Sequence, residues 1–304
     1  FKQKTAYEIK ECDWSSDVCS SDLALAEVGA REALIALAVN DGADLPEFSV
    51  RRMIERFGSD GEMREALLSR PGLPAAMRAE LVAATARALS VFVTERDWLS
   101  QARADRLARE ASEKASVIIA SDIDDEAGNG PLALVRHLRH SGQLTSSLVL
   151  RALLSGNRCL FDAALAELSG QPFGRVTGLV DGWRGAAFPA LYRRAGLPES
   201  LLPAFRAALA AHEEIGAVFE DETRARLSRA KVERVISACE RLNTTELGKL
   251  MALLRRFEAE AAQEEAREFA EKLRESAPEP LAFPGPASFC EPELIEVPAL
   301  AEAA

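Results

Sequence analysis

The chain has 304 residues, of which 48% are hydrophobic and only 6% aromatic, and its formal net charge is −11. This length supplies enough apolar material for one or two packed domains. The abundance of Ala and Leu favours helices over sheets, and no apolar run reaches the roughly eighteen residues that a membrane span needs. The acidic composition and the low cysteine content favour a cytoplasmic protein over a disulfide-stabilised secreted one.

Residues 1–23 resemble a translated sequencing adapter, because Asp13 to Leu23 and Lys2 to Ile9 back-translate to the two ends of a common adapter. A segment of this origin is set aside before the fold is considered, and we expect it to be disordered. Its three Lys and five acidic residues contribute −2, so the remaining 281 residues carry −9. The native start is then missing, and a signal peptide ahead of it stays an open alternative to the cytoplasmic assignment.

Apolar residues recur with a helical period along nearly all of the remaining chain, as on the face formed by Leu160, Phe161, Ala164 and Leu165. The pattern predicts helices at 24–40, 47–57, 61–69, 75–93, 96–120, 132–140, 146–155, 159–169, 173–181, 187–194, 199–219, 222–241 and 244–274. Two strand-like segments, 90–94 and 116–121, lie within long helical patterns and lack hairpin partners. The sequence therefore predicts an all-α fold.

The motif R-x-G-L-P occurs twice between predicted helices, at 70–74 and at 194–198, and looser versions lie at 42–46 and 170–172. Gly72 and Gly196 suit the left-handed conformation that closes a helix, and Pro74 and Pro198 suit the first turn of the next helix. Short helices joined by such turns stack as antiparallel hairpins. We therefore expect stacked helical hairpins, in an α-solenoid or HEAT-like helical array.

Composition divides the chain into successive regions. We predict an N-terminal helical region at 24–120, an acidic, Gly-rich linker at 121–131 and a central repeat-like helical domain at 132–241. A long helix at 242–275 follows, and Asn243 with Glu246 three residues later forms a capping arrangement at its start. Residues 276–304 contain six Pro and read as a disordered tail.

Few residues suggest catalysis or metal binding. The acidic loop at 122–126 lacks the Gly and the Glu that an EF-hand requires. His137 and His140 are three residues apart and share a helix face, but no third ligand accompanies them, and His212 lies on an apolar face.

The cysteines that follow the adapter-like segment, Cys159, Cys239 and Cys290, are too far apart in sequence for a zinc motif or a disulfide framework. No serine-nucleophile, P-loop or dinucleotide motif is present. We therefore expect no metal, no cofactor and no catalytic residue, and an enzyme of unknown class is the third hypothesis.

Charge is segregated along the chain. Residues 131–210, which we call the Arg-rich block, contain nine Arg and four acids, a balance of +5, whereas the rest of residues 24–304 carries −14. Arginine suits carboxylate or phosphate partners, so a candidate anionic-partner surface consists of Arg136, Arg139, Arg184, Arg193, Arg194 and Arg206. This hypothesis requires the arginines to converge on one face. A local acid beside each of them would make the balance a compositional effect.

The segment GQLTSSLVLRALLSGNRCLFDAALAELSGQPFGRVTGLVDGWRGAAFPALYRRAGLPESLLPAFRAAL, residues 142–209, resembles a bacterial family of unknown function, DUF2336. The similarity extends over residues 24–220 or so. The resemblance implies an all-helical, repeat-like fold and assigns no activity, cofactor or catalytic residue.

We therefore expect a non-enzymatic protein-protein interaction or regulatory scaffold with an unknown protein partner. The second hypothesis is a nucleic-acid- or anion-binding protein that uses the Arg-rich block. The acidity of the chain and the lack of aromatic stacking positions weigh against nucleic acid.

Overall fold

The computed structural model describes residues 20–40, 42–43, 45–123, 129–216, 224–240 and 247–276. The predictions for residues 1–19, for the capping arrangement at Asn243 and Glu246, and for the tail from 277 onward lie outside these ranges. Residues up to Glu265 belong to one compact unit and those from Ala266 to a second. The contacts reported below all lie within the first unit.

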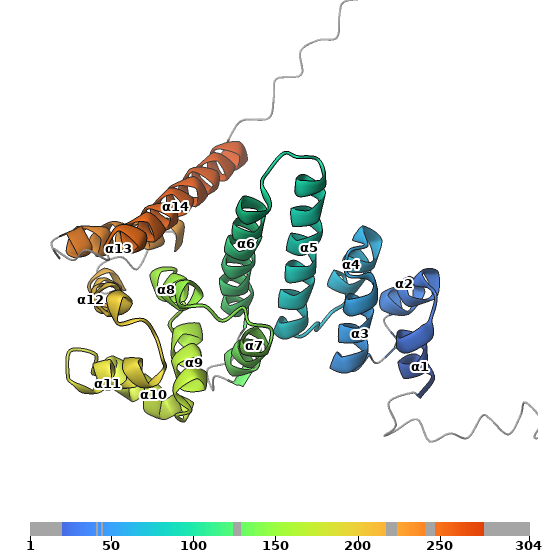
Figure 1. Cartoon of the computed structure of the whole chain (residues 1–304), viewed down its shortest axis with the longest axis horizontal. Helices are drawn as coiled ribbons and strands as arrows, with labels where there is room; N and C mark the ends of the chain where they lie inside the picture. The colour runs from blue at the N-terminus through green and yellow to red at the C-terminus, as the bar shows by residue number, and fades with distance from the viewer. Residues whose placement is uncertain are drawn as a thin grey trace, which may run out of the picture. The chain divides into compact units, whose positions relative to one another are not determined.

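The described residues form helices and contain no strand (Figure 1). Two adjoining elements, the 3-10 turn η1 (Glu199–Leu201) and α12 (Leu202–Gly216), replace a single predicted helix. The other helices are α1 (Ser20–Val28), α2 (Arg31–Val39), α3 (Glu47–Phe57), α4 (Gly61–Leu68), α5 (Ala75–Glu95), α6 (Gln101–Ser121), α7 (Asn129–His140), α8 (Ser146–Leu154), α9 (Arg158–Ser169), α10 (Phe173–Asp181), α11 (Ala187–Arg194), α13 (Arg224–Glu240) and α14 (Leu247–Ser276).

The prediction of one helix over 24–40 is wrong, because α1 and α2 are separated at Gly29 and Ala30. Ala30 has an extended backbone with φ −69° and ψ 158°, and glycine lowers the helix propensity at the break. Conversely, α1 begins at Ser20, so the last four residues of the adapter-like segment are helical rather than disordered. A helix extends readily into preceding residues that contain no proline.

The predicted linker at 121–131 is shorter than expected. Ser121 ends α6, and residues 129–131 form the first turn of α7. Residues 124–128 lie outside the described ranges.

Three of the helix starts have side-chain caps. Asp60, Thr145 and Asn157 accept hydrogen bonds from backbone N–H groups three residues ahead, at the beginnings of α4, α8 and α9. Such residues satisfy backbone donors that have no partner within the helix. They fix where each helix begins, and so they set the register of its buried face.

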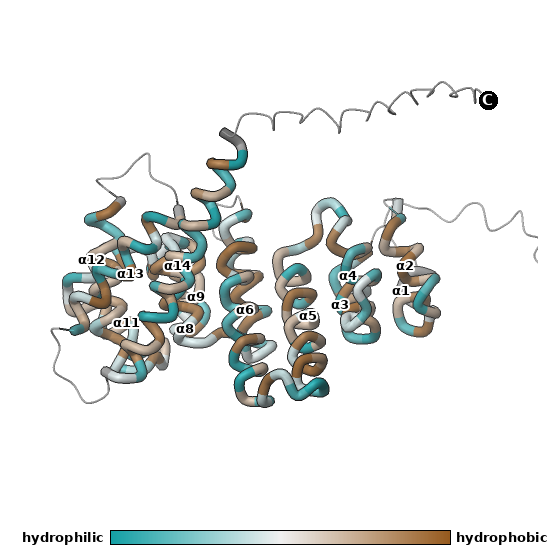
Figure 2. The backbone as a smooth tube through the Cα atoms, turned by 90° about the horizontal axis from the view of Figure 1, so that it is seen from above, coloured by the Kyte–Doolittle hydropathy of each residue, from teal (hydrophilic) through white to brown (hydrophobic). Residues whose placement is uncertain are grey.

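The buried apolar residues form two clusters. One contains residues between 26 and 84, and the other contains residues between 79 and 257, so the clusters meet in α5. Val117 and Leu134, on either side of the predicted linker, lie in the same cluster. The hydrophobic core therefore divides at α5 and not at 121–131. Figure 2 shows apolar and polar residues alternating along helices such as α6, which is the pattern of helices with one buried face.

Helices pack mainly against near neighbours in the chain. The odd-numbered helices contact one another in succession from α1 to α11, and α2 contacts α4 as α6 contacts α8. The long helices α5 and α6 also pack against each other, as α12 does against α13. Local contacts of this kind position α5 and α6 as a hairpin joined by the turn at residues 96–100.

Gly72 and Gly196 adopt the left-handed conformation that the sequence predicts, with φ of 72° and 70°. Gly196 directly follows the C-cap of α11, whereas Gly72 lies in a separate turn beyond the C-cap of α4. Pro74 and Pro198 occupy the N-cap positions of α5 and η1, one residue earlier than the first turn. The hydroxyl of the buried Tyr192 donates a 2.7 Å hydrogen bond to the Pro198 carbonyl and fixes the second joint.

Candidate functional site

The arginines of the Arg-rich block mostly have carboxylate partners within the chain. Six of the nine form ion pairs, which are Arg136 and Arg139 with Glu167, Arg151 with Glu113 and Glu260, Arg158 with Asp162 and Asp181, Arg184 with Glu213, and Arg193 with Glu199. Glu113, Glu213 and Glu260 come from outside residues 131–210 and offset part of the +5 balance, which already counts the other four acids. The arrangement therefore weighs against one open cationic surface.

Two further arginines of the predicted surface bind backbone carbonyls. Arg194 Nε donates a 2.9 Å hydrogen bond to the carbonyl of Ser169, the last residue of α9, and Arg206 lies 3.4 Å from the carbonyl of Arg184. Arg70, at the same position of the first R-x-G-L-P motif, donates to the carbonyls of Ala38 and Asn40 at the end of α2. The motif arginine thus caps an earlier helix at both joints, a role that the sequence analysis missed.

His137 and His140 each lie beside an oxygen atom of the chain. His137 Nε2 lies 3.1 Å from Glu80 Oε2, and this contact is the main reason that the pKa of Glu80 is lowered. His140 Nδ1 lies 2.7 Å from the carbonyl of Arg136. Arg136, His137 and His140 line a groove of about 980 Å³ beside α3 and α5.

Burial shifts the pKa of both His212 and Cys239. Burial, together with the nearby Lys231, lowers the pKa of His212 to about 4. Burial raises the pKa of Cys239, so its thiol is poorly nucleophilic. Within the described ranges no three His, Cys, Asp or Glu side chains gather as metal ligands would.

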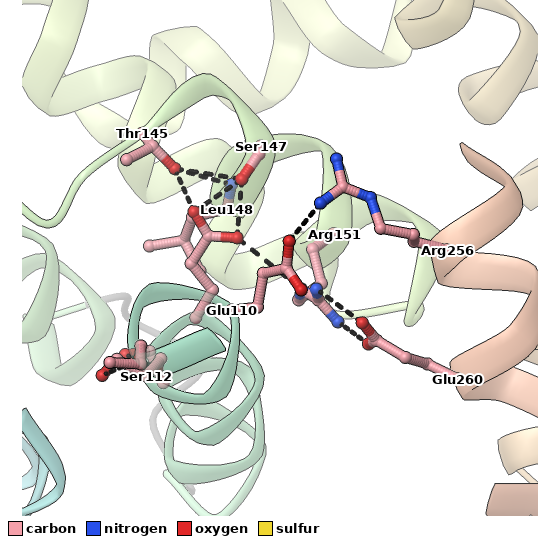
Figure 3. A network of polar contacts seen from close by, with 11 residues as sticks. Glu110, Ser112, Thr145, Ser147, Leu148, Arg151, Arg256 and Glu260 are labelled. Carbon is pink, nitrogen blue, oxygen red and sulfur yellow. Dashed lines mark hydrogen bonds and ion pairs between the residues drawn. The ribbon is translucent and has the colours of Figure 1, made fainter. Parts of the chain in front are cut away.

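A buried polar network joins α6, α8 and α14 (Figure 3). The carboxylate of Glu113, a residue that is 8% exposed, accepts hydrogen bonds of 2.5 Å from Thr145 Oγ1 and 2.6 Å from Ser147 Oγ. Its Oε2 also lies 3.9 Å from Nε of the buried Arg151, and the Arg151 guanidinium forms an ion pair with Glu260. The polar side chains of this network therefore bind one another, which is typical of a network with a structural role.

An exposed aromatic cluster lies where α5 turns into α6, and we call Phe92, Arg96 and Trp98 the α5–α6 tip. Trp98 is 65% exposed and Phe92 42% exposed. Their rings meet edge to face at 5.8 Å, and the Arg96 guanidinium stacks 3.7 Å from the centre of the Phe92 ring. Contact with Arg96 and with each other holds both rings at the surface instead of in the core.

The tip belongs to an unusually apolar stretch of surface. Of the twelve exposed large hydrophobic side chains in the described residues, five lie between 89 and 107, including Leu89, Val91 and Leu107. A cavity of about 400 Å³ borders this region and extends between α5 and α6 from Val91 and Gln101 to Thr145. The sequence signal was available, because residues 89–99 hold more large apolar side chains than one buried helix face accepts.

These features define an all-helical protein whose most distinctive surface is apolar and aromatic. Among the described helices, none combines the length and the hydrophobicity that crossing a membrane requires. The chain belongs to the family DUF2336, uncharacterised proteins conserved in bacteria, whose family model matches residues 21–245. No curated protein and no solved structure matches the chain.

Proposed function

We propose that this chain is a non-enzymatic, cytoplasmic protein-protein interaction module that binds a partner through the α5–α6 tip. In this proposal the helices stack as a solenoid-like array, which the successive contacts among α1, α3, α5, α7 and α9 support. A helical array holds a long hairpin rigid, so that its tip can be presented to a partner.

The observation that carries the proposal is the exposure of Trp98 beside Phe92 and Arg96. Trp, Phe and Arg are enriched in protein interfaces, and Trp and Arg dominate their binding energy. Large apolar side chains gathered at a surface commonly mark an interaction site. The partner expected from this chemistry presents an apolar pocket to the two rings and hydrogen-bond acceptors to the outer N–H groups of Arg96.

The proposal is tested by photo-crosslinking in cells that express the native gene. A photoreactive phenylalanine analogue replaces Trp98 in one protein and Leu68, which is 52% exposed on α4, in a control. We expect one discrete adduct from position 98, its loss when Arg96→Ala is added, and none from position 68. Equal adducts from both positions would contradict a site at the tip.

A further inference from the structure

The first half of α14 packs against α6, α8 and α13, and we call the surface that it covers on these helices the α14 groove. The apolar stripe Leu250, Leu254, Phe257 and Ala261 is buried, with each residue at most 8% exposed. Its spacing of four, three and four residues is the heptad pattern by which one helix docks onto others. The first three of these residues join the same hydrophobic cluster as α8 and α13.

Charges along the groove match charges along α14 in order. Near the middle of residues 247–265, Arg256 pairs with Glu110 of α6, and Arg255 lies 3.7 Å from Glu240 of α13. One to two turns later the signs reverse, and the glutamates of α14 meet cations. The reversed pairs are Glu260 with Arg151, Glu264 with Lys114 at 2.6 Å, and Glu265 with Arg229 at 2.9 Å.

Arg151 contacts α14 residues from the groove side, and residues outside α14 orientate its side chain. Glu113 lies beside Arg151 Nε and is itself held by Thr145 and Ser147 (Figure 3). The guanidinium also forms an ion pair with Glu260, and its Cζ atom lies 4.3 Å from the centre of the Phe257 ring. A buried cation in this arrangement suits a carboxylate and an aromatic ring as partners.

The family match ends at residue 245, whereas α14 begins at Leu247. The matched residues therefore contain all of the groove residues named above but not the helix that fills it. Without an occupant, Arg151 and the apolar lining would face water.

We propose that the groove formed by α6, α8 and α13 is a helix-binding site, which α14 occupies in this chain and which also accepts a partner helix of the same chemistry. That helix presents heptad-spaced leucine and phenylalanine, arginine near its middle and glutamate one turn further on. Because α14 and the partner compete for one groove, release of α14 exposes the site. This site uses residues other than those of the α5–α6 tip, so the two proposals can be tested separately.

The test uses a fluorescent peptide of residues 247–265 and the full chain. Leu254→Asp with Phe257→Asp in the full chain displaces α14 and leaves every groove residue intact. Fluorescence anisotropy should then show at least tenfold tighter peptide binding to this variant than to the unchanged chain. A peptide that carries Leu254→Asp serves as the control and should not bind.

Charge reversal identifies the groove as the binding site. Arg151→Glu, added to the displaced variant, should abolish binding of the unchanged peptide, and a peptide with Glu260→Arg should restore it. Failure of the displaced, folded variant to bind the unchanged peptide would overturn the proposal.

Hydrogen exchange of the unchanged chain keeps the proposal testable if the variants do not fold. The amides of residues 250–265 should exchange faster than those of α8 and α9, because α14 opens while the core stays closed. Equal protection of α14, α8 and α9 would mean that α14 is a permanent part of the core, and the proposal would fail.

Discussion

At the scale of single residues, three arginines bind the carbonyl ends of helices that precede them in the chain. Arg56 donates hydrogen bonds of 2.8 Å to the carbonyls of Ala26 and Gly29 at the end of α1, as Arg70 does for α2 and Arg194 for α9. The last carbonyls of a helix have no partner within it, and they carry the negative end of the helix dipole. A guanidinium fork can reach several of them at once.

We expect Arg70→Ala to lower the free energy of unfolding by about 1 to 3 kcal/mol, because the carbonyls at the end of α2 lose charged donors. Arg70→Lys should recover only part of this loss, since an ammonium group lacks the planar fork. Urea unfolding measures both changes. The matched control is Arg103→Ala on the exposed side of α6, where no partner is present among the described residues, and it should change stability by less than about 0.5 kcal/mol.

The lowered pKa of His212 predicts how the stability of the fold changes with pH. Its pKa in the fold is about 4, below the ordinary value of 6.5, so the unfolded chain binds more protons between these values. The stability that the neutral imidazole contributes is therefore complete above pH 6.5 and is lost as the pH falls towards 4. His212→Gln should reduce the drop in melting temperature between pH 7 and pH 5. An identical drop in both proteins would show that His212 is not responsible.

At the scale of the helices, local chemistry in the sequence was sufficient for most of the fold. Apolar periodicity placed α3, α10 and α11 with the bounds that the structure has. The helix predictions failed where tertiary contacts determine whether the chain stays helical. The break at Gly29 was missed because a single glycine within an apolar period does not reveal whether the chain turns.

The candidate surfaces were harder to predict than the helices. A count of charges along the chain cannot show that Arg136 and Arg139 share Glu167, because that acid lies on a different helix. The α14 groove likewise depends on pairs such as Lys114 with Glu264, which are 150 residues apart in the sequence. Helical periodicity reports which face is apolar but not which helix covers it.

Two glycines make it possible to measure the cost of a positive φ separately from the cost of steric crowding. An added Cβ would meet no atom within 4 Å at either Gly196 or Gly174, but only Gly196 has a positive φ. Gly196→Ala should therefore destabilise by about 1 kcal/mol, whereas Gly174→Ala, inside α10, should stabilise by about 0.5 to 1 kcal/mol. Thermal unfolding of the two variants provides the measurement. A loss of equal size at both positions would indicate crowding rather than backbone strain.

At the scale of the whole molecule, the two hydrophobic clusters predict that stability is not uniform. The smaller cluster is built from α1 to α5 and contains the fully buried Met53 and Met63, whereas the larger one contains Phe161. Because the clusters share α5, unfolding of the smaller cluster need not open the larger one. Cooperative units of this kind exchange their amides with separate free energies of opening.

Met63 is fully buried, so Met63→Ala should lower the free energy of unfolding by about 2 to 5 kcal/mol. We expect this variant to lose amide protection in α1 to α4, whereas α8 and α9 should keep theirs. Phe161→Ala should reduce protection in α8 and α9 directly, because its ring stacks on Phe205 at 6.0 Å within the larger cluster. Hydrogen exchange resolved by peptide compares the two variants. If each substitution lowers protection equally throughout α1 to α13, the helices unfold as one cooperative unit, and α5 transmits strain between the clusters instead of separating them.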